Sequence, residues 1–92
     1  MKPLTQALPG ALSELLRETP LSPGKVSFAW RAAVGAQVGR ATSVLLEDRT
    51  LIVEPVDATW AREITRSSPV ILTRLQTLMG KDTVMRILVR DP

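Results

Sequence analysis

The sequence predicts a small α+β domain in which a three-stranded sheet carries helices on one face. Runs of β-branched and aliphatic residues at 42–47 and 50–56, joined by a short polar link, are typical of a β-hairpin. A helical apolar stripe follows at about 57–79, and a third strand-like run occupies 84–90. A hairpin joined to a third strand through a helix gives a three-stranded sheet with helices packed against it.

Two helices are expected before the sheet. The first is leucine-rich, covers about 10–17 and ends before Pro20. The second begins at Ser22 and Pro23, because a capping hydroxyl followed by proline at the first helical position is a helix-start signal. Gly39 is expected to end this second helix.

The second strand of the hairpin is expected to have two different faces, because side chains alternate along a strand. One face carries Leu51, Val53 and Pro55, and the other carries Ile52, Glu54 and Val56. The hairpin therefore presents one apolar face and one half-polar face.

Asp57 is expected to open the long helix, whose stripe consists of Trp60, Ile64, Ile71, Leu75 and Leu78. Pro69 lies within this stripe, where it removes a hydrogen bond and clashes with the preceding turn. We therefore expect a kink or a split at Pro69, and an end at Gly80. The last run alternates Val84, Arg86, Leu88 and Arg90 with Met85, Ile87 and Val89, which predicts a strand with one basic face.

The composition argues against an enzyme. The 92 residues suffice for one domain and include neither His nor Cys, so the commonest proton shuttle, metal ligands and thiol nucleophile are missing. Gly35 and Gly39 are followed by Arg40, not by the Gly-Lys-Ser/Thr of a phosphate loop. We expect no catalysis, no cofactor and no metal. The chain has no apolar run long enough for a membrane span and no signal-peptide pattern, so a cytoplasmic location is expected.

The charge balance suggests an anionic partner. The formal net charge is +3, and nine of the 12 cationic residues are arginine, which suits bidentate contact with phosphate. A GC-rich genome would produce the same excess of arginine. Arg62 and Arg66 could also belong to a solvated helix face on which they pair with acidic neighbours. The predicted nucleic-acid contacts are Arg62, Arg66, Arg86 and Arg90, helped by Arg40 or Arg49.

The two tryptophans pose a choice between core packing and base stacking. Trp30 and Trp60 each lie near an arginine, but both also lie on the apolar stripe of a predicted helix. That position is more typical of a core residue. We therefore expect both to pack in the core, with the rims that carry their indole N–H groups at the surface.

Several short features follow one another along the chain: Trp30, Val34-Gly35, Thr42, Leu51-x-Val53, Trp60-Ala61-x-Glu63-Ile64, Leu78-Met79-Gly80 and the basic strand. Their order and spacing resemble the DciA family over about residues 8–90. The resemblance implies a fold like the type II KH domain. It also implies a loader or operator of the hexameric replicative helicase DnaB, which binds single-stranded or forked DNA without hydrolysing ATP.

The sequence differs at several positions from the KH domain and from the DciA family. The stretch 66–69, Arg-Ser-Ser-Pro, stands where a KH domain has its G-x-x-G clamp, so an RNA-type clamp is not expected. Ala41 replaces a His that is common in the family, and Arg49 replaces a hairpin Gly. A KH-like RNA-binding or ribosome-assembly factor is the alternative, and a protein adaptor with arginines for acidic surfaces is a third class.

The partner surface is expected on the helical layer, because the first helix has more leucines than its own packing needs. The predicted partner contacts are Leu8, Leu12, Leu15 and Leu16, with Arg17 and Arg31 at the rim. An exposed leucine patch of this kind would also favour weak self-association.

Overall fold

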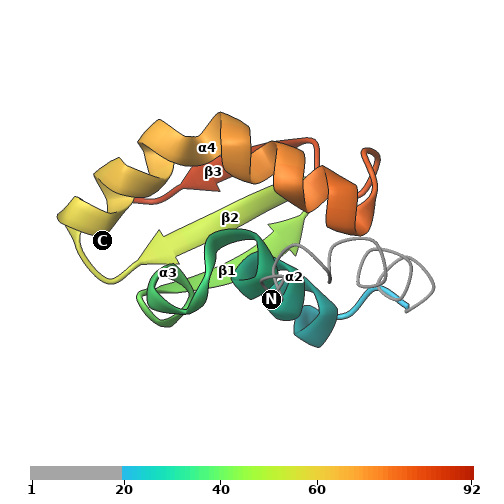
Figure 1. Ribbon diagram of the computed structural model, residues 1–92, viewed down its shortest axis with the longest axis horizontal. Coiled ribbons are helices and arrows are strands. Elements are labelled where there is room, and N and C mark those ends of the chain that lie inside the picture. The colour runs from blue at the N-terminus through green and yellow to red at the C-terminus, as the bar shows by residue number, and fades with distance from the viewer. Residues whose placement is uncertain (1–19) are drawn as a thin grey trace, which may run out of the picture.

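The computed structural model describes residues 20–92. Its elements are α2 (Pro23–Val34), α3 (Ala36–Arg40), β1 (Thr42–Glu47), β2 (Thr50–Pro55), α4 (Ala58–Met79) and β3 (Arg86–Val89). The sheet order is β1-β2-β3, with β1 and β2 antiparallel and β2 and β3 parallel (Figure 1). The predicted α+β class with a three-stranded sheet is confirmed, whereas the first predicted helix lies outside the described residues.

The second predicted helix is in fact two helices. Ser22 caps α2 as expected, since its hydroxyl accepts from the Lys25 N–H at 3.2 Å. The predicted end at Gly39 is wrong. The chain turns at Gly35, whose φ of 89° lies in the region that glycine adopts without steric cost. Gly39 lies inside α3 and is buried beneath Arg31, whose Cγ would stand 2.9 Å from an added Cβ.

The hairpin agrees with the prediction, and β1 and β2 pair along their whole length. Asp48 and Arg49 form a two-residue turn, and both have positive φ, 48° and 62°. Turns of this hand match the right-handed twist of the flanking strands. Leu51 and Val53 are fully buried beneath the helices, as the alternation predicted. On the opposite face, Glu54 and Val56 are exposed, but Ile52 is only 7% exposed, so burial does not follow the predicted alternation there.

Helix α4 begins as predicted, because the Asp57 carboxylate accepts from the Trp60 N–H at 2.9 Å. Pro69 does not split it, and α4 is a single helix. Ile64 before the proline and Ile71 after it are both buried in the same core. This packing outweighs the roughly 3 kcal/mol that an interior proline costs.

The core lies between the helices and one face of the sheet. Its members are Val26, Ala29, Trp30, Ala33, Leu51, Val53, Ile64, Ile71, Leu75, Leu78, Met79 and Val84. Trp30 is only 1% exposed, so the expectation that its rim reaches the surface is wrong. Its indole N–H donates to Thr42 Oγ1 at 2.8 Å, and this hydroxyl donates to the Val38 carbonyl at 2.7 Å. The Thr42 hydroxyl therefore accepts the indole hydrogen bond that water would accept at the surface.

Strand β3 is shorter than predicted, and the predicted alternation holds only within it. Leu88 faces outward and is 51% exposed, while Ile87 packs against the core. Before the strand the pattern reverses, because Val84 is fully buried and Met85 is 48% exposed. These two residues precede the paired part of the strand, where a two-residue period no longer applies.

Candidate nucleic-acid interface

The sheet topology separates the six predicted arginines into two groups. Because β2 and β3 are parallel, both end at the edge of the sheet where β1 begins and α4 starts. We call this part of the molecule the basic end, and it carries Arg40, Arg62, Arg66 and Arg90. Arg49 and Arg86 lie at the other end, a strand length of about 17–20 Å away.

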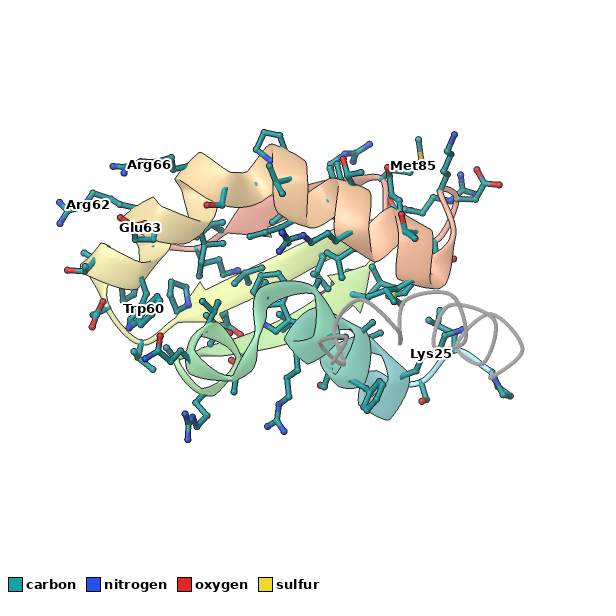
Figure 2. All side chains as sticks on the ribbon, viewed as in Figure 1. Lys25, Trp60, Arg62, Glu63, Arg66 and Met85 are labelled. Atoms are coloured by element: carbon teal, nitrogen blue, oxygen red, sulfur yellow. The ribbon has the colours of Figure 1, made fainter. Side chains whose placement is uncertain are left out.

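Two of the arginines at the basic end come from the first half of α4. Arg62 and Arg66 project outward from the body of the protein (Figure 2). Arg66 lies 3.7 Å from Glu63, and the two side chains are 76% and 56% exposed. Exposed pairs of this kind contribute less than about 1 kcal/mol, so a phosphate can displace Glu63 at little cost. Arg62 has no ion-pair partner among residues 20–92.

The other two arginines of the basic end flank the sheet. Arg90 follows β3 and lies 3.7 Å from Glu54, with both side chains about half exposed. Arg40 is the exposed last residue of α3. The next residue, Ala41, accepts from the Val56 N–H at 2.9 Å, which fixes α3 beside the end of β2.

The arginines at the far end are engaged with the hairpin turn. An Arg49 guanidinium nitrogen lies 3.8 Å from Met85 Sδ, and an Arg86 nitrogen lies 3.4 Å from Thr50 Oγ1. Figure 2 shows Met85 at the opposite end of the molecule from Arg62. A strand bound at the basic end would reach Arg49 and Arg86 only by crossing the length of the sheet.

A cavity of about 190 Å³ lies at the basic end, between the α2–α3 corner and the first half of α4. Its apolar walls are Ala33, Val34, Val38, Ile64 and Ile71. Its polar lining is Trp60, Glu63, Ser67 and Arg74. Figure 2 shows Trp60 pointing from the first turn of α4 toward α3. Trp60 packs against the core but is only partly buried, so the two tryptophans are not equivalent.

The sequence analysis did not identify Ser67 and Arg74 as site residues. The signal was present, because positions 60, 63, 67, 71 and 74 are spaced by three or four and so share one face of a helix. What the spacing could not show is that the end of α2 lies opposite that face. Arg74 joins the two walls, since its guanidinium donates to the Ala33 carbonyl at 3.1 Å.

A larger groove of about 530 Å³ lies between the start of α2, β1 and the segment that precedes β3. Leu21 and Leu45 line it and are 59% and 47% exposed, and Phe28 on α2 is 53% exposed. Of the predicted partner contacts, Arg31 is exposed on α2. The others, Leu8, Leu12, Leu15, Leu16 and Arg17, lie outside the described residues.

Within residues 20–92, no three His, Cys, Asp or Glu side chains are placed to hold a metal ion. None of the described helices has the length and apolar character needed to cross a membrane.

Comparison with known proteins gives one match. A family model described as Dna[CI] antecedent, DciA, matches residues 3–89. No curated protein and no solved structure matches the chain. The family match confirms the resemblance that the two tryptophans and the intervening hairpin indicated, and it implies a role of the helicase-loader type in association with the replicative helicase DnaB. Since the match covers nearly the whole sequence, the chain belongs to the DciA family.

Proposed function

We propose that this protein binds the DnaB-type replicative helicase and single-stranded or forked DNA, and promotes helicase loading without chemistry of its own. Family membership supports the helicase partner. The observation that carries the DNA contact is the basic end, where three segments contribute four exposed arginines.

The geometry of the basic end supports weak and sequence-independent DNA binding. Each arginine is exposed, and two of them form ion pairs, Arg66 with Glu63 and Arg90 with Glu54, that are both 3.7 Å long and solvated. Such side chains can reach phosphate oxygens, but they present no ordered array for reading base edges. Binding should therefore weaken steeply as salt rises.

The continuity of α4 favours this reading over the RNA-binding alternative. The KH type II-like assignment stays a prediction, but a G-x-x-G clamp requires a loop between paired helices. The stretch 66–69 is helical throughout and its one proline lies inside α4. The described chain therefore offers no loop at the position where a KH domain would hold RNA.

For the helicase contact, we infer a surface on the helical layer near the start of α2. The exposed Leu21, Phe28 and Leu45 supply apolar area there, beside the groove of about 530 Å³. A stable interface needs about 800 Å² from each partner, which a domain of this size can provide. The leucine-rich segment around residues 8–16 remains the predicted addition to this surface.

Two arginine pairs give a matched test of the DNA contact. Replacing both Arg62 and Arg66 by alanine should lower the slope of log K against log salt for a single strand by about 1.4, at about 0.7 per phosphate contact. Replacing Arg49 and Arg86 removes the same charge at the far end and should leave the slope nearly unchanged. Equal losses from the two pairs would show that the basic end is not the contact.

Co-elution with the cognate helicase, followed by loading on a forked substrate, tests the rest of the proposal. We expect a complex and stimulated loading at micromolar protein. Reversing the charge at Arg31 should slow association, because rim charges act mainly on the on-rate. If neither complex nor stimulation appears, while ribosomal subunits retain the protein, the RNA-binding alternative replaces this proposal.

A further inference from the structure

The two tryptophans differ in one respect that bears on ligand binding. The indole N–H of Trp30 is sealed inside the core by its bond to Thr42. The indole N–H of Trp60 has no acceptor among residues 20–92, although its ring packs against the same core and lines the cavity at the basic end. Trp60 therefore lines this cavity with an aromatic ring, and its indole N–H is unused within the described residues.

The cavity combines apolar walls with unused polar groups. The Ser67 hydroxyl makes no hydrogen bond within residues 20–92, and the Glu63 carboxylate makes only the exposed pair with Arg66. Arg74 uses one guanidinium nitrogen on the Ala33 carbonyl, which leaves further N–H groups at the cavity wall. A heteroaromatic ring can place its faces against the apolar walls and its polar edge against these donors and acceptors, which a hydrocarbon side chain cannot do.

The surroundings of the cavity select among ligands that carry such a ring. Arg62 and Arg66 are the sequence neighbours of Glu63 and Ser67 on α4, and Arg40 follows the Val38 wall by two residues. At about 100° per residue, Arg62 and Arg66 point away from the lining face of α4, so they are placed for the phosphates that flank a ligand and not for the cavity itself. A base attached to a phosphate backbone fits this arrangement, and a volume of about 190 Å³ admits one ring system at a time.

We propose that this cavity binds one base of single-stranded DNA against the Trp60 indole. The polar edge of the base would meet Glu63, Ser67 and Arg74, while the flanking phosphates contact the arginines of the basic end. This inference rests on the proposed DNA binding and adds a subsite that recognises an unpaired base, which a duplex cannot offer because its bases are stacked and paired. It gives a physical reason for a preference for single strands and forks.

The test compares two oligonucleotides of equal length and charge, about ten nucleotides each. One carries bases throughout and the other is abasic. The wild-type protein should bind the base-containing strand at least about fivefold more tightly in fluorescence anisotropy. Ser67→Leu should abolish this preference by filling the cavity mouth, and should leave abasic binding unchanged. Thr73→Leu, on an exposed position of α4 away from the cavity, is the matched control and should behave as wild type.

A fluorescence measurement gives an independent readout. The base-containing strand should protect part of the tryptophan emission from acrylamide quenching, and Trp60→Phe should remove that protection. Equal binding of both strands by the wild type would overturn the base subsite and leave the proposed DNA contact intact. Absence of binding to either strand would remove the DNA contact itself and the subsite with it. If Ser67→Leu weakens co-elution with the helicase and leaves both strands unaffected, the cavity anchors a protein side chain and the inference is wrong.

Discussion

Replacing Thr42 by valine tests the internal bond that holds Trp30. Valine has nearly the shape of threonine, so the substitution removes the hydroxyl without opening a cavity. The indole N–H of Trp30, in a ring that is 1% exposed, then loses its acceptor at 2.8 Å. The Val38 carbonyl also loses a donor, but it still accepts from the Ala41 N–H at 3.1 Å. The cost therefore falls mainly on the indole.

The expected magnitude follows from that unpaired donor. An unsatisfied buried donor costs about 1–3 kcal/mol, and the added methyl group returns up to about 0.8 kcal/mol. The free energy of unfolding should fall by about 1–2 kcal/mol. With a urea m-value near 1.5 kcal/mol/M, the midpoint should move down by about 1 M. Circular dichroism is the appropriate probe, because tryptophan fluorescence would report the mutated environment itself.

Thr65→Val provides the control for this experiment. The Thr65 hydroxyl donates to the Ala61 carbonyl of its own helix at 2.8 Å, and no buried donor depends on it. Its loss should change stability by less than about 0.5 kcal/mol. Trp30→Phe combined with Thr42→Val should cost less than the sum of the single changes, because the unpaired indole is then absent. If Thr42→Val behaves like Thr65→Val, water reaches the Trp30 indole and the sealed core is refuted.

Three further changes test the frame around the basic end. Trp60→Ala should cost about 2 kcal/mol, below the 3–5 kcal/mol of a fully buried tryptophan, because this ring is only partly buried; an unchanged denaturation midpoint would show that Trp60 contributes no packing. Asp57→Ala should cost about 1 kcal/mol by removing the cap on the Trp60 N–H; a smaller loss of helical signal than in Thr65→Val would contradict the capping role. Gly35→Ala places a Cβ in open space but at φ 89°, so backbone strain of about 1–2 kcal/mol should appear in urea titrations. A value near zero would mean that the α2–α3 corner relaxes freely.

The sequence was sufficient for those elements whose signals are local. Runs of β-branched and aliphatic residues identified both hairpin strands, and Ser22 and Asp57 marked two helix starts correctly. The predicted end of this helix at Gly39 was wrong, because the chain already turns at Gly35, and only the backbone path decides which glycine adopts positive φ. Pro69 predicted a kink or a split, and packing on both sides of it keeps α4 a single helix.

The candidate site depends on contacts between segments that are distant in the sequence, and such contacts are harder to predict from the sequence. Trp30 and Trp60 look alike in sequence, yet only Trp30 finds Thr42, which comes from the strand after the next helix. Four of the six arginines looked like two lines, Arg62 with Arg66 along α4 and Arg86 with Arg90 along β3. The parallel pairing of β2 with β3 divided them between two ends of the sheet, and no periodicity within one element could have shown this.

The hairpin turn links the local stability of two segments that lie 36 residues apart. Asp48 and Arg49 hold left-handed backbone angles that cost non-glycine residues about 1 kcal/mol each. The Arg49 carbonyl accepts from the Met85 N–H at 2.8 Å and from the Arg86 N–H at 3.4 Å. When β3 detaches, these hydrogen bonds are lost, and the strained turn becomes less stable. Native-state hydrogen exchange should therefore report one cooperative opening event for the turn and the start of β3.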